Sequence, residues 1–322
     1  MPDNCVIGID LGGTKALSGV VDAGGAVLHR GFRLVPRGAN TDAVIELLCE
    51  SVRDAEAAFG AQAVAVGVGI PSLVDQHTGR AGATMHLPLG GVPVRDLLSE
   101  RLGVPVAVDN DATCAMVAEH RAGAAAGAQT ALLITVGTGI GGGIVTNGQV
   151  LRGASGAAGE IGHMSIDPNG AACSGDCPNR GCWEQYVSGT ALRKAVVAAA
   201  ESDPSSALAR AAAEGRTLDG ALATELAHDG DPIARELIES MGRLLGAGIV
   251  NLVNMLNPEV VAVGGGAMGA GELLLEPARQ VVAERALSPS RDDVRIVATH
   301  FGDAAGMIGA AMLAADKLKE QG

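Results

Sequence analysis

Aromatic side chains are nearly absent from this chain. Its 322 residues include one Trp, one Tyr and three Phe, although 48% of the residues are hydrophobic. The core must therefore be built from Ala, Val, Leu and Ile rather than from stacked rings. A chain of this length is expected to form one large or two medium domains with a sizeable core.

Basic residues and long apolar runs are also scarce. The 23 Lys and Arg against 36 Asp and Glu give a net charge of −13, which argues against a nucleic-acid partner because phosphates need cationic side chains. No apolar run with a basic flank opens the chain, so no signal peptide is expected. The apolar runs are broken by Gly and too short to span a bilayer. We therefore expect a cytoplasmic protein with no membrane partner and with reduced cysteines.

The chain does contain a local cluster of cysteines. Three of its six cysteines fall within ten residues, just downstream of a histidine and between two glutamates. Three thiolates and one imidazole complete a closed tetrahedral zinc site. The alternatives are a disulfide within the cluster or free thiols in a Gly-rich loop. A metal would hold the two glutamates where they could bind a polar ligand. The residues concerned are Glu160, His163, Cys173, Cys177, Cys182 and Glu184.

Two apolar strand candidates run into Gly-Thr-rich turns. Residues 6–10 lead into Gly12-Gly13-Thr14-Lys15, and residues 131–136 lead into Gly137-Thr138-Gly139. Such turns present backbone N–H groups that bind phosphate oxygens. A plain hairpin turn is the alternative for the first. The repetition suggests a duplicated α/β fold in which each half offers one phosphate-binding hairpin.

The second turn also matches the dinucleotide fingerprint. Gly137, Gly139 and Gly142 have the G-x-G-x-x-G spacing, and Glu160 follows about 20 residues later. The fingerprint requires a helix after the third Gly, whereas the Asn147-Gly148 hairpin signal follows here. We therefore disfavour an NAD enzyme.

A polar segment, Asp109-Asn110-Asp111, directly follows a strand predicted over residues 104–108. Ligands of α/β sheets bind at the carboxyl ends of strands. Asp111 could therefore act as a general base, and Asn110 could bind the same ligand. Alternatively, Asp111 is the N-cap of a helix predicted over residues 112–122, and both roles are compatible. Another predicted helix covers Thr41–Phe59, with Thr41 as its N-cap.

Taken together, these motifs resemble the ROK family of bacterial sugar kinases and repressors. The resemblance runs from about residue 6 to about residue 315 and includes Gly264-Gly265-Gly266. The segment Cys182-Trp183-Glu184-Gln185-Tyr186 is most similar to the actinobacterial-type glucokinases. The resemblance implies an α/β fold of the actin/hexokinase/Hsp70 (ribonuclease H-like) type, duplicated into two lobes with a cleft between them. The implied small lobe comprises residues 1–122 and 301–322, and the large lobe residues 123–300.

The resemblance also implies roles for individual residues. Asp111 matches the catalytic base, and Asp10 matches the residue near Mg²⁺. Residues that match sugar contacts are Asn110, Glu160, His163 and Glu184. Residues that match contacts to the phosphates and the nucleotide of ATP are Gly12, Gly13, Thr14, Lys15, Thr138, Gly139, Gly265 and Gly266. Residues that match the ligands of a structural zinc are His163, Cys173, Cys177 and Cys182.

The chain departs from the family pattern at four places. Cys173 and Cys177 have the spacing C-x₃-C where the family has C-x-C, which makes Cys173 the least certain zinc ligand. His86, Ser72 and Thr113 stand where the family has Asn, Gly and Asn. These three changes fall near the implied sugar pocket, so they bear on which sugar is bound more than on the reaction.

From this pattern we expect an ATP-dependent hexose kinase that acts as a homodimer or homotetramer. Glucose is the first candidate substrate, and N-acetylmannosamine, N-acetylglucosamine and mannose are the alternatives. Polyphosphate is the alternative donor, disfavoured because no Lys/Arg-dense stretch is evident. A sugar-sensing regulator is the remote alternative, disfavoured because the first phosphate turn starts by residue 10 and leaves no room for a preceding DNA-binding domain.

Overall fold

The chain divides into two compact units. The computed structural model describes residues 4–82, 87–174 and 177–321. The first unit consists of residues 1–129, 143–159 and 300–322, and the second of residues 130–142 and 160–299. The chain therefore passes between the units four times. The predicted lobes differ from these units in that segments 123–129 and 143–159, together with residue 300, group with the first unit.

The first unit is built on a five-stranded sheet of order β3-β2-β1-β4-β7. β1, β4 and β7 are parallel, whereas β2 and β3 run antiparallel to their neighbours. Its strands are β1 (Asn4–Leu11), β2 (Lys15–Val21), β3 (Val27–Leu34), β4 (Gln62–Ile70), β7 (Val106–Asn110) and the short pair β5 (Val74–Asp75) and β6 (Arg80–Ala81). Its helices are α1 (Thr41–Phe59), α2 (Val94–Leu102), α3 (Asp111–Ala122) and α10 (Ala305–Gln321), preceded by the short turn η4 (Gly302–Ala304).

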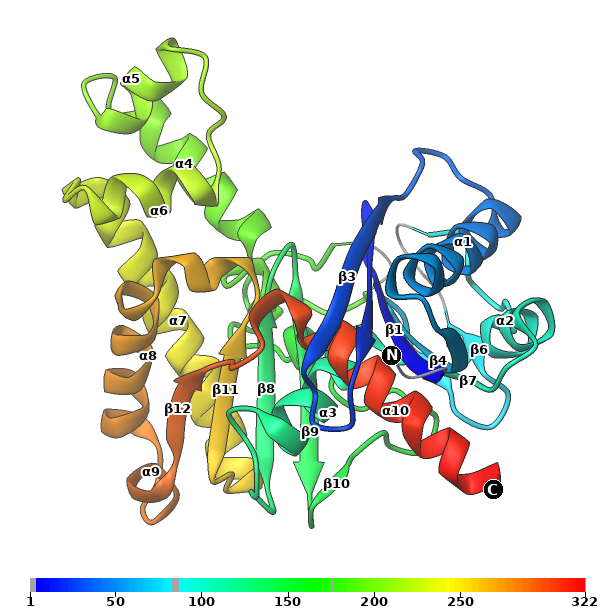
Figure 1. Ribbon diagram of the computed structural model, residues 1–322. Helices are drawn as coiled ribbons and strands as arrows, with labels where there is room; N and C mark the ends of the chain where they lie inside the picture. Colours follow the sequence, from blue (N-terminus) through cyan, green and yellow to red (C-terminus); the bar gives the residue numbers. More distant parts are fainter. Residues whose placement is uncertain (1–3, 83–86, 175–176, 322) are drawn as a thin grey trace. The chain divides into compact units, whose positions relative to one another are not determined.

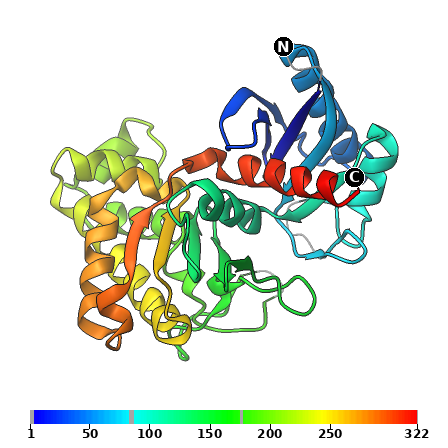
Figure 2. The same ribbon diagram turned by 60° about the horizontal axis from the view of Figure 1, so that its bottom comes forward.

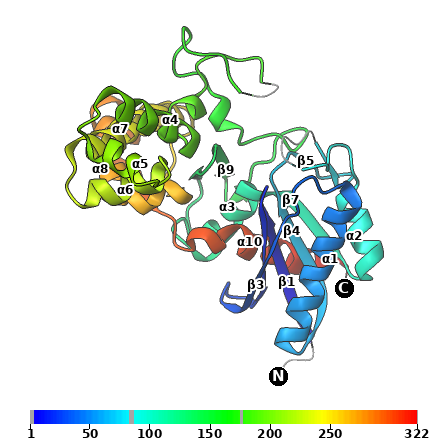
Figure 3. The ribbon, with the colours of Figure 1, turned by 90° about the horizontal axis from the view of Figure 1, so that it is seen from above.

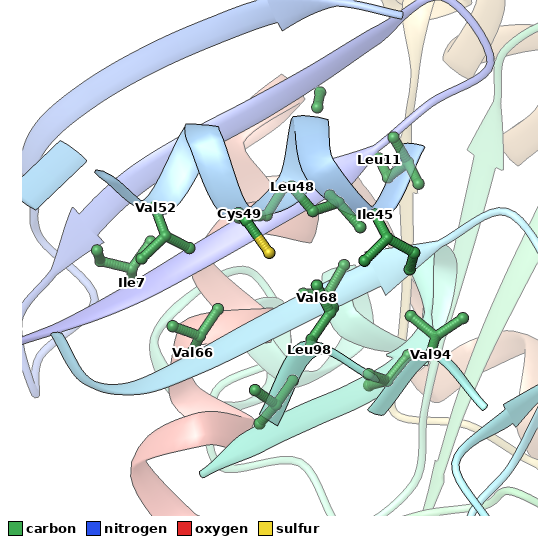
Figure 4. Packing of buried hydrophobic residues seen from close by; sticks show 14 of the residues in the cluster. Ile7, Leu11, Ile45, Leu48, Cys49, Val52, Val66, Val68, Val94 and Leu98 are labelled. Carbon is green, nitrogen blue, oxygen red and sulfur yellow. The ribbon is translucent and has the colours of Figure 1, made fainter. Parts of the chain in front are cut away.

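Helices cover both faces of this sheet. Figure 3 shows α1 and α2 on one side and α10 on the other, where α10 packs against α3, β1 and β4. The apolar residues of α1 recur at helical spacing, so Ile45, Leu48 and Val52 point onto Ile7 and Val68 of the sheet (Figure 4). This core consists of aliphatic side chains and two buried cysteines, Cys5 and Cys49, and its described residues include no buried aromatic ring, as the composition predicts.

The second unit contains most of a second five-stranded sheet, of order β10-β9-β8-β11-β12. The strands are β8 (Ala131–Val136), β9 (Ile140–Thr146), β10 (Gln149–Val150), β11 (Val260–Gly264) and β12 (Arg295–Ala298). The helices are α4 (Gly189–Ser202), α5 (Ala207–Ala213), α6 (Gly220–His228), α7 (Pro232–Leu256), α8 (Glu272–Arg285) and α9 (Ser290–Asp293), with turns η1 (Ile161–His163), η2 (Trp183–Gln185) and η3 (Gly266–Ala270). α8 packs against α7 and β12 (Figures 1 and 2). None of the described helices has the length and apolar character needed to cross a bilayer.

Several element boundaries differ slightly from the prediction. The N-cap of α1 is Asn40, whose side chain accepts a hydrogen bond from Ala43 N, and Thr41 is the first helical residue. β7 spans residues 106–110 rather than 104–108, because α2 ends in a left-handed Gly103 and Pro105 follows before the ladder begins. The predicted hairpin is present, since β9 and β10 pair antiparallel across Asn147 and Gly148. The strand that continues through Gly143 confirms that no helix follows the second glycine turn.

Candidate active site and metal centre

The predicted acidic residues of the first unit meet at one edge of its sheet. The parallel register places Asp10 of β1 opposite Gly69 of β4, and Gly69 opposite Asp109 of β7. Asp111 follows β7 directly as the first residue of α3. The carboxyl ends of β1 and β7, on either side of β4, therefore carry Asp10 and the 109–111 segment, as expected for a ligand site in an α/β sheet.

Asp10 lies in a crowded, acidic environment. Burial raises the pKa of Asp10 to about 7, with further contributions from the nearby Asp111 and Asp303 carboxylates and an opposing one from Lys15. A Cβ added to Gly306 of α10 would lie only 2.8 Å from the Asp10 carboxyl carbon. Excess negative charge at a partly enclosed site favours a cation, so the environment of Asp10 fits the predicted role near Mg²⁺.

The helix cap at this site is Asn110 and not Asp111. Asn110 Oδ1 accepts a hydrogen bond of 3.0 Å from Thr113 N, while Asp111 Oδ1 accepts one of 2.8 Å from Ala112 N. The alternative that Asp111 is the N-cap is therefore wrong. Asn110 keeps its amide N–H₂ group, which lies 3.4 Å from Ser72 O, as the part that could donate to a sugar hydroxyl.

A buried network behind this segment was missed by the sequence analysis. Asp109 is 4% exposed. Its Oδ2 accepts hydrogen bonds of 2.8 Å from Arg152, and its Oδ1 accepts from Gln76 Nε2 at 3.0 Å and from Asn110 N at 2.9 Å. Burial raises the pKa of Asp109, and Arg152 opposes that rise. A carboxylate directly after the apolar run Val106-Ala107-Val108 was the available signal, but its partner lies 43 residues away.

Arg152→Ala is expected to lower the free energy of unfolding by about 2–3 kcal/mol, because it leaves a buried carboxylate without its cation. The loss should fall below that of a fully buried pair, since the Arg152 side chain is 29% exposed. Urea unfolding measures the difference. Arg33→Ala is the matched control, because it removes surface ion pairs with Glu50 and Asp54 and should cost less than about 1 kcal/mol. Equal losses in the two variants would contradict a stabilising role of the buried Asp109–Arg152 pair.

The first glycine turn connects β1 to β2. Gly12 N donates to Lys15 O at 2.8 Å, and Thr14 O accepts from Val35 N at 2.9 Å. Gly13, Thr14 and Lys15 are exposed. The turn is therefore a hairpin whose ends are fixed while its tip stays open, so a hairpin and a phosphate-binding turn are compatible here.

The second glycine turn, Gly137–Gly139, contacts the carboxylate of Glu184. Glu184 Oε2 accepts a 2.8 Å hydrogen bond from Ile140 N, and a Cβ on Gly139 would lie 2.1 Å from that oxygen. The start of α4 also contacts the turn, because Gly189 N donates to Gly137 O and Thr190 Oγ1 donates to Thr138 O. The predicted sugar-binding residue Glu184 and the predicted phosphate residue Gly139 are therefore in direct contact.

Gly265 lies against the same turn. Its φ is +88°, and a Cβ at this position would lie 2.6 Å from Val136 O. β11 pairs parallel with β8, which places Gly264 opposite Thr135. Only glycine allows the chain after β11 to pass this close to the end of β8, so Gly265 and Gly266 follow the strand adjacent to the Gly137–Gly139 turn.

The cysteine cluster forms as its spacing predicts. One ligand atom from each of His163, Cys173, Cys177 and Cys182 lies within 4.8 Å of the others. Cys173 Sγ is 3.5 Å from His163 Nδ1, and Cys177 Sγ is 3.9 Å from Cys182 Sγ. Four ligands at zinc–sulfur distances of about 2.3 Å would have sulfur–sulfur edges of about 3.8 Å. The extra residues between the first two cysteines do not keep Cys173 from the cluster.

The chemistry of the four donors fits zinc. A separation of 3.9 Å between the Cys177 and Cys182 sulfurs is not a disulfide. Burial and the two neighbouring thiols raise the pKa of Cys182 to about 12, because several thiolates repel one another without a cation. A divalent metal would supply the missing positive charge. Zinc binding by these residues stays a prediction.

His163 connects this cluster to a glutamate. Its Nδ1 faces Cys173, and its Nε2 is 3.8 Å from Glu160 Oε2. Partial burial raises the pKa of Glu160, the nearby Glu184 raises it further, and His163 opposes that rise. The ring can thus offer one nitrogen to a metal while the other orients a carboxylate, an arrangement typical of metal-bound histidine.

The loop that carries the cluster is anchored in the second unit. Trp183 is buried, and its Nε1 donates to Leu244 O at 3.0 Å. Tyr186 OH donates to Asp167 Oδ2 at 3.0 Å, and Asn179 Nδ2 donates to His163 O at 2.9 Å. Because Trp183 is the chain's only tryptophan and follows Cys182 directly, its fluorescence reports on this loop.

The predicted site residues thus form two groups, one in each unit. Asp10, the first glycine turn and Asn110–Asp111 belong to the first unit. The second glycine turn, Gly265 and Gly266, both glutamates and the four candidate zinc ligands belong to the second. His86, named above for its departure from the family pattern, lies outside the described residues.

Known proteins are similar to this chain over nearly its whole length. The ROK family model matches residues 6–317. The chain belongs to the ROK family. A glucokinase of Streptomyces coelicolor is 33% identical over 312 residues, which cover 96% of each chain. The structure of a ROK family glucokinase from Streptomyces griseus, in complex with glucose and AMPPNP, superposes with a TM-score of 0.87 at 34% identity and covers 97% of this chain and 99% of that one.

Not all ROK family relatives are kinases. The xylose repressor of Caldicellulosiruptor bescii is 28% identical over 325 residues, which cover 97% of this chain and 79% of the repressor. The predicted fold class is confirmed, since the two α/β units are those of ROK sugar kinases. The glucokinases among the relatives support a sugar kinase that uses ATP.

Proposed function

We propose that this ROK protein transfers the γ-phosphoryl group of ATP to the 6-hydroxyl of glucose. The main support for the proposal is the arrangement of residues at the carboxyl ends of the strands of the first sheet. There an exposed glycine turn follows β1, Asp10 lies near the end of β1, and the Asn110–Asp111 pair lies at the end of β7, with β1 and β7 on either side of β4. The similarity to a glucokinase whose structure holds glucose and AMPPNP supports the choice of ligands.

Asp111 is proposed as the general base. A sugar hydroxyl is a weak nucleophile at neutral pH, and a carboxylate within hydrogen-bond reach accepts its proton as the bond to phosphorus forms. The Ala112 N–H binds one carboxylate oxygen of Asp111 and orients the group. The Asp109–Arg152 pair fixes the backbone immediately before it. Asp109 and Arg152 are thus positioning residues, and Asp111 acts on the substrate.

Charge neutralisation is the other requirement of phosphoryl transfer. The N–H groups of the two glycine turns are proposed to bind phosphate oxygens, with Thr14, Lys15 and Thr138 beside them. Asp10 would hold Mg²⁺, which when bound neutralises charge on the β- and γ-phosphates. Glu160, His163, Glu184 and the amide of Asn110 are proposed to bind the sugar hydroxyls.

The raised pKa of Asp10 predicts an unusual pH dependence of stability. An acid whose folded-state pKa is about 7, against an ordinary value of 3.8, binds its proton more tightly in the folded state. The protonated form of Asp10 therefore contributes fully to the free energy of unfolding below about pH 4, and this contribution is lost as the pH rises towards 7. We expect Asp10→Asn to raise Tm relative to wild type at pH 8 and to leave the difference near zero at pH 4.

Thermal scans from pH 4 to 8 measure this difference, and added MgCl₂ should reduce it at pH 8 if the cation binds Asp10. Comparison with the variant isolates Asp10 from other groups that titrate in the same range. A Tm difference between wild type and Asp10→Asn that does not change with pH would show that Asp10 is an ordinary carboxylate.

The proposed zinc has a structural role. A site with three cysteines and one histidine has no open position for water or substrate. Zinc would fix His163 and, through it, Glu160, while Cys182 lies two residues before Glu184. The four donors thus tie the predicted sugar ligands to the loop that Trp183 anchors.

A comparison of sugars tests the proposed substrate. Purified protein with Mg²⁺–ATP is assayed for ADP release with glucose, mannose, N-acetylglucosamine and N-acetylmannosamine. We expect the highest kcat/KM with glucose. A higher value with an acetylated sugar or mannose would reassign the substrate within the sugar kinases. No hexose-dependent ADP release with any of the four would favour a regulator and reject the kinase proposal.

A further inference from the structure

Two carboxylates are buried in the first unit. Among the described residues, Asp109 and Glu119 are the only charged side chains that are buried, at 4% and 0% exposure. Asp109 has its Arg152 counterion. Glu119 has a different kind of environment, because its hydrogen-bond partners in the described part of the chain are backbone amides.

Three amides from two distant segments converge on Glu119. Its Oε2 accepts hydrogen bonds from Ala124 N at 2.8 Å and His300 N at 2.9 Å, and its Oε1 accepts one from Phe301 N at 2.9 Å. Burial of a carboxylate is costly unless such bonds compensate it. The Glu119 carboxylate is also packed tightly against the backbone, since a Cβ on Gly123 would lie 2.3 Å from Oε2.

The two segments are those that connect the first unit to the second. The chain leaves the first unit after residue 129, five residues beyond Ala124, and finally returns to it at residue 300. Glu119 therefore binds His300, the first residue after the chain's final return to the first unit. It also binds Ala124, which lies five residues before the chain first leaves that unit. Asp109 binds Arg152 in the middle of segment 143–159, and so contacts the remaining stretch of the first unit that lies between two passages.

We propose that Glu119 is a positioning residue of the sugar kinase reaction. It fixes to α3 the points at which the chain leaves and re-enters the first unit. The proposal rests on the proposed function, in which residues of both units take part, and concerns the conformation of these two segments within the first unit. Glu119 itself lies eight residues after Asp111, about 12 Å along α3, and so cannot touch the reacting atoms.

Loosening these segments is expected to weaken substrate binding. If the conformation of these segments that is competent for sugar binding is populated less often, the apparent affinity falls by the same fraction. Glu119→Gln keeps the shape but replaces one acceptor oxygen by an N–H₂ group that faces an N–H donor. We expect faster amide hydrogen exchange at residues 124, 300 and 301 and a KM for glucose raised about fivefold or more.

Val52→Ala is the matched control. Val52 lies in the α1 core at 2% exposure, so its truncation lowers Tm without touching the connecting segments. The KM for glucose of this control should stay within about twofold of wild type. Glu119→Asp, which keeps the charge but is one methylene shorter, replaces Glu119→Gln if that variant does not fold, with the same two measurements.

Two results would overturn the proposal and leave Glu119 a purely structural residue. One is a Glu119 variant with the same kinetic constants as Val52→Ala. The other is unchanged amide hydrogen exchange at residues 124, 300 and 301. The exchange measurement does not depend on turnover. Absence of sugar phosphorylation in wild type would therefore reject the proposed function, whereas unchanged exchange would reject the anchoring by Glu119.

Discussion

Asp111→Asn is expected to lower kcat by about 10²-fold or more while leaving the sugar Kd and Tm close to wild type. The amide is nearly isosteric with the carboxylate but cannot accept the hydroxyl proton. Its oxygen can still accept the hydrogen bond from Ala112 N. The substitution leaves the N-cap of α3 intact, because the capping residue is Asn110.

The variant is measured by steady-state ADP release, by sugar titration calorimetry and by thermal unfolding. Asp42→Asn is the matched control, because Asp42 also lies in the first turn of a helix and its side chain is 84% exposed. It should leave all three quantities unchanged. Near-normal turnover in folded Asp111→Asn would rule out Asp111 as the base.

Removal of metal from the cysteine cluster is expected to weaken sugar binding and thermal stability together. A bound zinc would organise the loop between His163 and Cys182, so its binding energy contributes to folding of that loop. Chelation should lower Tm, raise the KM for glucose about tenfold and change the fluorescence of Trp183. Metal analysis should find about one zinc per chain in the untreated protein.

Single substitutions test the ligands one by one. Cys182→Ala should reproduce the effects of chelation, since it removes a donor two residues from Glu184. Cys173→Ala is the sharper test, because its spacing departs from the family pattern although its sulfur lies 3.5 Å from His163 Nδ1. Cys5→Ala is the control, because this buried thiol lies in β1 of the first unit, whereas the cluster belongs to the second unit. Full zinc retention in Cys173→Ala would show that another group completes the site, and no zinc in wild type would disprove the centre.

Local sequence patterns predicted the parts of the site that are close along the chain. The cysteine cluster spans twenty residues from His163 to Cys182, so spacing alone was informative. The two glycine turns and the hairpin at Asn147–Gly148 were also predictable, because turn chemistry depends on adjacent residues. The helix caps were displaced by one residue, since Asn40 and Asn110 each precede another good capping residue, and the difference in capping preference between two such residues is small.

Contacts between distant residues were not predictable in the same way. The Asp109–Arg152 pair joins residues 43 positions apart, and Glu119 meets His300 and Phe301 across 181 and 182 positions. Hydrophobic periodicity places a residue on a helix or strand but does not identify its partner on another element. The contact between Glu184 and the Gly139 turn belongs to the same class.

The most direct test is the product formed from glucose and ATP by wild-type protein. Glucose 6-phosphate is measured by its oxidation with a coupling dehydrogenase, and ADP is measured in parallel, with 6-deoxyglucose as the control sugar. We expect one glucose 6-phosphate per ADP, and no sugar-dependent ADP release with 6-deoxyglucose beyond slow hydrolysis. ADP release without glucose 6-phosphate, or no ADP release at all, would contradict phosphoryl transfer to the 6-hydroxyl of glucose.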